Sequence, residues 1–178
     1  MSDDLHLDAD LRARAAELRR EWRADEEEWS RAALEHFRHG RSLVDVLRAA
    51  MHRGDVVVLG DGAGAPRGVV AHVGDDWCRL DAAGGVVELA VTRSGPVVRV
   101  VEHSRRGGSG GDPHAPKAWR ARLLELEVAG GPCVVELTTG ETLTGTVLVG
   151  GDHVVVSAGD DETYVPMGAL ARLRPSCD

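Results

Sequence analysis

The chain has 178 residues, a formal net charge of −8 and 43% hydrophobic residues, of which few are aromatic. That length fits one domain or two small ones, and the negative charge does not provide the positive field on which non-specific nucleic-acid binding depends. Arginine outnumbers lysine twenty to one, a skew typical of a GC-rich bacterial genome.

The cysteine pattern and the lack of long apolar runs indicate the compartment. Cys78, Cys133 and Cys177 lie far apart without CxxC spacing, which favours reduced thiols. No basic and apolar leader opens the chain, and no run approaches the ~18 apolar residues of a membrane span. We therefore expect a cytoplasmic protein with no membrane contact.

Residues 8–39 predict one long helix, because they are strong helix formers without internal Gly or Pro, and Gly40 provides a stop. A coiled-coil-like stripe follows steps of three and four residues: Leu11, Ala15, Leu18, Trp22, Asp25, Trp29, Ala32 and His36. Two interpretations remain open. The helix packs on its own chain, or it dimerises or binds a partner through Leu11, Leu18, Trp22 and Trp29.

The rest of the chain predicts two similar units. Ser42 and Asp45 form a capped start for a short helix that Gly54 ends, and five β-like runs follow between Asp55 and Glu102. Residues 104–116 are rich in Gly, Ser and Pro and predict a flexible linker. A second short helix and five runs then follow, so the predicted segments are 1–41, 42–103, 104–116 and 117–178.

The two units are an internal repeat. When Gly68 is aligned with Gly145, RGVVAHVGDDWCRL matches TGTVLVGGDHVVVS without a gap. A small flat sheet would leave two exposed edges and little core, and curling it requires bends for which Gly68 and Gly145 are placed. We therefore predict an α+β protein: an N-terminal helical segment followed by two tandem five-stranded small β-barrels, each preceded by a short helix.

The second copy resembles the Sm and LSm family. VVELTTGETLTGTVLVGGDHVVV is similar to the first block of that family and YVPMGALARLR to the second, so the chain resembles a divergent bacterial member with two copies. The resemblance covers 117–175, and more loosely 42–102. It implies SH3-like barrels, ring assembly through the fourth and fifth strands, and binding of single-stranded RNA around the pore.

The resemblance also implies candidate RNA contacts. The family's RNA-reading Asn is replaced by His153 in the second copy and by Asp76 in the first, and only the first copy keeps an arginine in the later loop, at Arg93. Trp77 or His153 is suited to stacking on a base; the alternative for Trp77, a lone Trp that begins a strand, is packing in the core or at its rim. Arg93, Trp77 and His153 are therefore the candidate RNA contacts.

No motif indicates an enzyme. His36 and His39 lack the HExxH or Cys partners of a metal site, no GxSxG is present, and GDGAGAPRG lacks the GKS/T ending of a phosphate loop. We expect no catalytic residues, metal, cofactor or small-molecule substrate. The prediction is a non-enzymatic assembly or adaptor protein that binds a protein partner or itself through strand edges and the N-terminal helix; the alternative is an RNA-binding regulator.

Overall fold

The computed structural model describes residues 3–92 and 95–175; within the first helix it describes side chains for residues 14, 16–33 and 40. Contacts between Cα atoms divide the chain into two compact units, 1–41 and 42–178.

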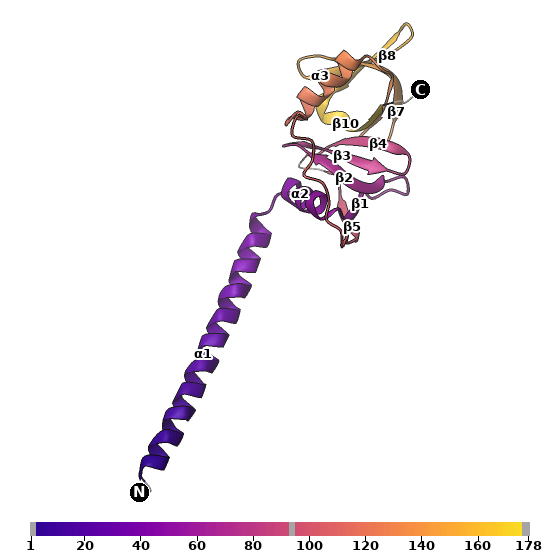
Figure 1. The fold of residues 1–178 in the computed structure, drawn as a ribbon. Helices are drawn as coiled ribbons and strands as arrows, with labels where there is room; N and C mark the ends of the chain where they lie inside the picture. Colours follow the sequence, from indigo (N-terminus) through magenta and orange to yellow (C-terminus); the bar gives the residue numbers. More distant parts are fainter. Residues whose placement is uncertain (1–2, 93–94, 176–178) are drawn as a thin grey trace. The chain divides into compact units, whose positions relative to one another are not determined.

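The described part of the first unit is one helix, α1 (Asp3–Gly40), somewhat longer than the predicted 8–39 (Figure 1). Its described side chains are exposed to solvent, apart from Ala16, which is partly buried. Arg14 and Glu17 form an ion pair one turn apart at 3.4 Å, one of the local contacts that stabilise an exposed helix only weakly.

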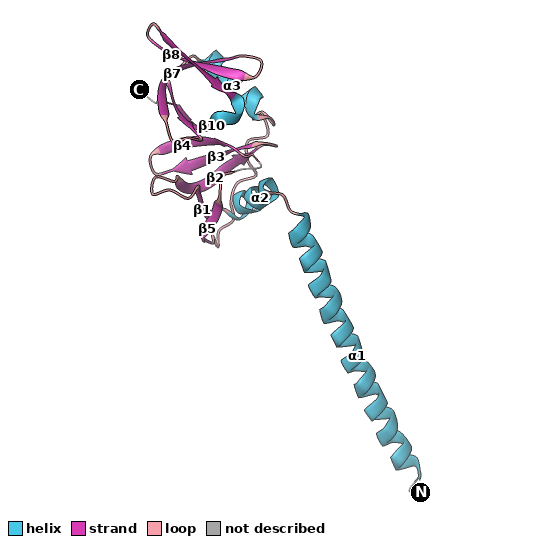
Figure 2. Ribbon diagram, turned by 180° about the vertical axis from the view of Figure 1, so that it is seen from behind, coloured by secondary structure: helices cyan, strands magenta, loops and turns pink. Residues whose placement is uncertain are grey.

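The second unit consists of a β-sheet and two helices (Figure 2). The helices are α2 (Leu43–Arg53) and α3 (Trp119–Ala129). The described strands are β1 (Val56–Leu59), β2 (Arg67–Val73), β3 (Trp77–Ala82), β4 (Gly85–Ala90), β5 (Val98–Glu102), β6 (Cys133–Leu137), β7 (Thr142–Val149), β8 (His153–Ala158), β9 (Asp161–Pro166) and β10 (Leu170–Pro175), with a 3-10 turn, η1 (Met167–Ala169), before β10.

Helix α2 begins as the sequence predicts. The Ser42 hydroxyl accepts a hydrogen bond from the Asp45 backbone, while the Asp45 carboxylate accepts one from the Ser42 backbone at 2.9 Å, which completes a capping box. Gly54 ends the helix in the left-handed conformation at φ 71°, where glycine is favoured. Asp therefore serves in the position where Glu or Gln is usual.

The predicted fold class is wrong. The strands form one open antiparallel sheet in the order β5-β1-β2-β3-β4-β10-β6-β7-β8-β9, rather than two separate five-stranded barrels. The prediction assumed that each copy would protect its own edges by curling closed. Instead, β4 of the first half pairs with β10 of the second, so the backbone groups at these two inner edges are satisfied across the halves.

Two hydrophobic clusters lie against this sheet, one under each helix. Leu47, Ala50 and Met51 of α2 contribute to the first, and Leu123 and Leu126 of α3 to the second. The boundary between the clusters does not follow the boundary between the halves. Trp77 of β3 and Ala90 of β4 belong to the cluster under α3, so the first half supplies core residues to the second.

Gly68 and Gly145 lie where neighbouring strands approach closely. A Cβ atom on Gly68 would overlap the Asp81 carbonyl oxygen of β3, and one on Gly145 would overlap the Ser157 carbonyl oxygen of β8. Strand β7 pairs with β6 up to Gly145 and with β8 from Thr146 onward. This glycine therefore stands where the strand changes its partner, and the close approach excludes a larger residue.

Residues 104–116 form no helix or strand but pack on the first half. The Ser104 N–H donates to Asp55 at 3.1 Å and the Gly108 N–H donates to the His52 carbonyl at 2.8 Å. Further on, the Trp77 indole donates to the Pro116 carbonyl at 3.0 Å. Hydrogen bonds therefore hold this segment against the first half along its path to α3.

Candidate functional site

The junction between the two halves combines strand pairing with polar side-chain contacts. In the β4–β10 pair, Arg172 lies opposite Leu89 and Leu173 lies opposite Glu88. Arg172 also forms an ion pair with Glu136 of β6 and donates to the Gly64 carbonyl of the first half at 3.0 Å. Strand pairing and side chains thus both join the halves.

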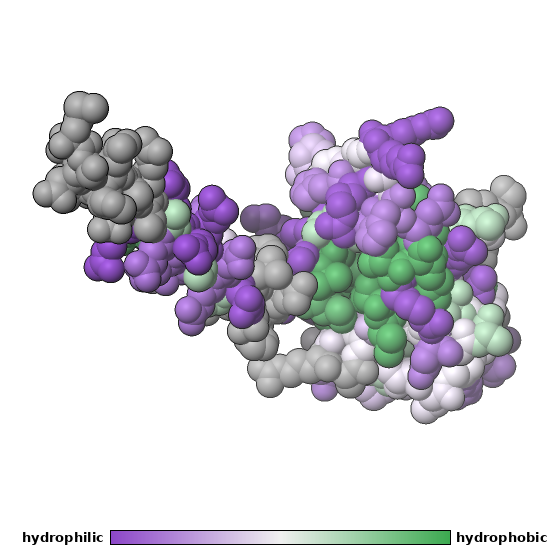
Figure 3. Space-filling view, turned by 90° about the horizontal axis from the view of Figure 1, so that it is seen from below, coloured by the Kyte–Doolittle hydropathy of each residue, from purple (hydrophilic) through white to green (hydrophobic). Residues whose placement is uncertain are grey.

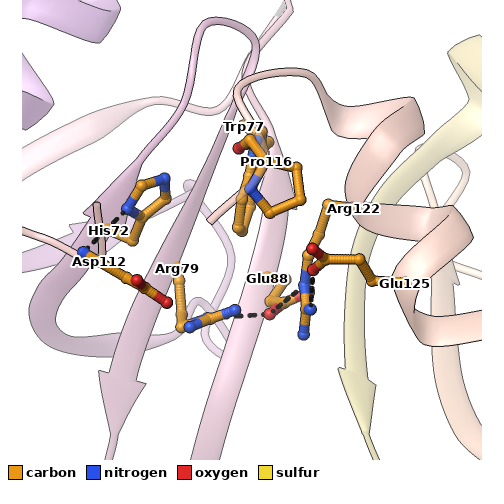
Figure 4. A network of polar contacts seen from close by, with 8 residues as sticks. All are labelled: His72, Trp77, Arg79, Glu88, Asp112, Pro116, Arg122 and Glu125. Carbon is orange, nitrogen blue, oxygen red and sulfur yellow. Dashed lines mark hydrogen bonds and ion pairs between the residues drawn. The ribbon is translucent and has the colours of Figure 1, made fainter. Parts of the chain in front are cut away.

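Glu88 is the centre of this junction. Its side chain is 1% exposed, and it accepts hydrogen bonds from Arg79 Nε of β3 at 3.0 Å and from Arg122 Nε of α3 at 3.0 and 2.9 Å (Figure 4). Arg122 also pairs with Glu125 at 2.7 Å. Burial opposes the charge of Arg122, but its hydrogen bonds to Glu88 and Glu125 outweigh that effect and raise the pKa of the guanidinium.

The sequence gives only a weak signal for this network. Glu88 interrupts the apolar run GVVELA of β4, where a buried sheet face favours another aliphatic residue. Its partner Arg122 lies on another element beyond the 104–116 segment, so no local spacing connects the two. A lone charged residue inside an apolar strand is therefore the one sequence signal for this network.

The same arrangement of strands occurs in both halves. Helices α2 and α3 each have 11 residues, and β3–β4 and β8–β9 pair over six positions each. The first of these pairs are Trp77↔Ala90 and His153↔Pro166, and the third are Arg79↔Glu88 and Val155↔Tyr164. Tyr164 of β9 therefore occupies the position that Glu88 has in β4.

The two outer strands of the sheet correspond to the two inner ones. Strands β4 and β9 are the fourth strands of the two halves. Strands β5 and β10 are the fifth strands, and each pairs with the first strand of its own half, β5 with β1 and β10 with β6. Arg99 of β5 and Arg172 of β10 each stand four residues after a glycine, Gly95 and Gly168. In the described sheet, β5 and β9 have a neighbour on one side only.

The side chains at the outer edges are apolar where the inner junction is charged. By strand register, Tyr164 corresponds to Glu88 and Val155 corresponds to Arg79. Val46 of α2 corresponds to Arg122 of α3, because each is the fourth residue of its helix. Tyr164 is 63% exposed, whereas Glu88 is covered by its neighbours. An exposed aromatic side chain on an unpaired edge strand is typical of an interaction surface.

Hydrophobic side chains also mark the β5 end of the sheet. Figure 3 shows a band of hydrophobic side chains, with hydrophilic residues mainly on one side and residues of intermediate hydropathy on the other. The exposed valines in this region include Val97, just before β5, at 55%, and Val101 of β5 at 43%. Both outer edges therefore combine unpaired backbone groups with exposed apolar side chains.

Comparisons with family models, curated proteins and solved structures gave no significant similarity. The candidate site is therefore defined by its own geometry.

Two of the three candidate RNA contacts, Trp77 and His153, lie in the described part of the chain. Trp77 is buried in the core, 5.1 Å from the His72 ring and 6.1 Å from the Trp119 ring, and offers no free face to a base. His153 is partly exposed, with Nδ1 2.9 Å from Asp152 and its ring 5.6 Å from Tyr164. Arg93 lies outside the described residues.

The candidate helix interface is exposed as far as it is described. Leu18, Trp22 and Trp29 have exposed fractions of 47%, 74% and 78%. The side chain of Leu11 lies outside the described residues. Two tryptophans this exposed on one helix indicate a surface that has no partner within its own unit.

Two cysteines, Cys78 and Cys133, are buried in the described part of the chain. Burial, together with the charge of Glu88, raises the pKa of the Cys78 thiol to about 12, so that it stays protonated. Cys133 is also a buried free thiol with a raised pKa. No group of His, Cys, Asp and Glu among the described residues is arranged to hold a metal ion, and no described helix has the length and apolar character needed to cross a bilayer.

Proposed function

We propose that this protein is a non-enzymatic assembly protein whose copies join edge to edge, β9 of one copy with β5 of the next. The observation that carries the proposal is the internal junction: β4 and β10 already form this contact inside one chain, and β9 and β5 are the corresponding strands, each with a neighbour on one side only in the described sheet. The sequence resemblance to Sm and LSm proteins supports it, because rings of that family form through the fourth and fifth strands.

The proposed register between copies is taken from the internal junction. Since Leu173 lies opposite Glu88 and Arg172 opposite Leu89, the corresponding contacts place Val100 opposite Tyr164 and Arg99 opposite Val165. In this register Tyr164 packs between Val155 of its own sheet and Val46 of the next copy. Apolar contacts then replace the buried ion pairs of the internal junction, which avoids the cost of desolvating charges when copies associate.

Charge is mixed at the two outer edges. Strand β9 begins with Asp161 and Glu162, whereas β5 carries both Arg99 and Glu102 and is followed by Arg105 and Arg106. In the proposed register Glu102 lies opposite Glu162, which is repulsive, while the arginines that follow β5 attract the acidic start of β9. Because the two edges differ, the contact is head-to-tail, and such contacts produce closed rings or open filaments.

Cysteine cross-linking tests the register. In a Cys177→Ser background, Val100→Cys combined with Tyr164→Cys should give a ladder of covalent oligomers on mild oxidation, because directly opposed residues have Cβ atoms about 4.5–5.5 Å apart. Val101→Cys with Tyr164→Cys is the matched control, since a shift of one residue turns the side chain to the other face. The ladder should be absent from the control.

Light scattering tests the apolar contact. Tyr164→Asp should weaken assembly roughly tenfold or more because it would bury an unpaired charge, while Tyr164→Phe should leave assembly intact, since the hydroxyl contacts only Glu162. A chain that shows no cross-links, or whose oligomers survive Tyr164→Asp unchanged, would refute the proposed function.

A further inference from the structure

Helix α1 presents aromatic side chains on one face. Trp22 and Trp29 are seven residues apart, a spacing that places them on the same side of a helix, and Leu18 lies one turn before Trp22. All three are exposed. In a heptad repeat, Trp22 and Trp29 take the a positions, and Leu18 and Asp25 take the d positions.

Charge is distributed unevenly along the same helix. Residues 14–23 include four arginines and two glutamates, whereas residues 25–31 include four acidic residues and one arginine. The described side chains in both stretches are exposed, apart from Ala16. The helix therefore has a basic segment followed by an acidic segment, so a copy running in the opposite direction would bring opposite charges together.

The residues that flank the stripe distinguish the two possible directions. In a parallel pair of helices, the flanking contacts are Arg14 with Arg19 and Glu21 with Glu26, and both are repulsive. In an antiparallel pair centred between Arg23 and Ala24, Arg19 faces Glu26, which is attractive. Only one of the two described flanking contacts, Glu21 with Glu28, then remains repulsive.

The antiparallel arrangement also covers the exposed apolar side chains. It places Trp29 of each copy against Leu18 of the other, and each Trp22 beside Asp25 and near the second Trp22. Aromatic and aliphatic side chains that pack in this way lose most of their contact with water, which is the main favourable term in association. Asp25 lowers the stability of this seam but opposes other registers, as single polar residues at such positions do.

We propose that α1 is a self-association helix that pairs antiparallel with α1 of a second copy of this chain through Leu18, Trp22 and Trp29. This contact does not require the sheet edges. It supplies a second, independent interface, so that chains joined by α1 present two sheets to further copies.

The test is sedimentation of the full chain carrying Tyr164→Asp, which disables the proposed edge contact, over a wide range of protein concentration. We expect a monomer–dimer equilibrium that Trp22→Ala with Trp29→Ala abolishes. Circular dichroism of the same samples should show helix content rising with concentration, since an isolated helix gains stability from packing. A chain that remains monomeric at all concentrations in this background would overturn the proposal, whatever the edges do.

Charge reversal tests the direction of pairing. Arg19→Glu should weaken the antiparallel dimer about tenfold, because two symmetric attractive contacts become repulsive, and the double variant Arg19→Glu with Glu26→Arg should restore wild-type affinity. In a parallel pair, Arg19→Glu would strengthen the dimer instead. That result, or an equal loss in the matched control Arg20→Glu on the outer face, would refute the antiparallel seam.

Discussion

Replacing Arg122 by Met should be among the most damaging single changes in the sheet unit. Arg122 donates to both oxygens of Glu88 at 3.0 and 2.9 Å, and Glu88 is 1% exposed, so the variant leaves a buried carboxylate with Arg79 as its remaining cationic partner. Breaking a buried ion pair on one side costs about 3–5 kcal/mol. Because Arg79 remains, we expect a loss at the lower limit, about 3 kcal/mol.

Urea unfolding measures this loss. At a slope of about 2 kcal/mol per molar urea, the midpoint should fall by about 1.5 M. Arg120→Met is the matched control on the same helix, because Arg120 is exposed and donates only to the Gly150 carbonyl at 2.9 Å, and it should change stability by less than about 0.5 kcal/mol.

A triple variant tests whether the unpaired charge is the cause. Replacing Arg79, Glu88 and Arg122 together by Met should recover most of the stability, since apolar residues of similar volume replace buried ion pairs at little or no cost. If Arg122→Met costs less than about 1 kcal/mol, or if the triple variant is less stable than the single one, the reasoning is refuted.

Three further predictions concern other parts of the sheet unit. Burial, with the charge of Arg79, lowers the pKa of His72 below its ordinary 6.5, so the unfolded chain takes up a proton first as the pH falls. Stability should therefore decrease below about pH 6.5 and His72→Gln should flatten that slope in urea titrations; an unchanged slope would contradict it. Gly145→Ala should cost about 1–3 kcal/mol in thermal unfolding because its Cβ meets the backbone of Ser157, whereas Gly84→Ala, which meets nothing within 4 Å, should be neutral. Fluorescence anisotropy with labelled single-stranded RNA should show no salt-sensitive binding, and tight binding that His153→Ala abolishes would favour an RNA-binding function instead.

Local features of the chain could be predicted from the sequence because they depend on neighbouring residues. The capping box of Ser42 and Asp45 and the stop at Gly54 follow from local backbone geometry. The repeat of a helix and five strands was visible for the same reason. Gly68 and Gly145 were predicted as bends that close two barrels, whereas in the structure they stand where neighbouring strands approach closely. These features do not specify which edge pairs with which.

The contacts that join the halves could not be predicted in this way. An edge strand such as β4 can be satisfied within its own half or by another segment, and its sequence is compatible with both. Glu88 gains Arg122 only after β4 and α3 have come together. For Trp77, at the start of a strand, the sequence left both base stacking and core packing open, and it did not show that the core would be the one under α3, which the first half does not complete alone.

The burial of Trp77 in the cluster under α3 makes the two copies of the repeat depend on each other for folding. If a duplicated ancestor had kept two self-sufficient copies, the chain could be cut within residues 104–116 without harm. Here such a cut would leave one fragment with an exposed indole and the other with a cavity the size of a tryptophan. Residues 42–178 should therefore unfold in a single cooperative transition, and neither copy is free to be lost or exchanged on its own.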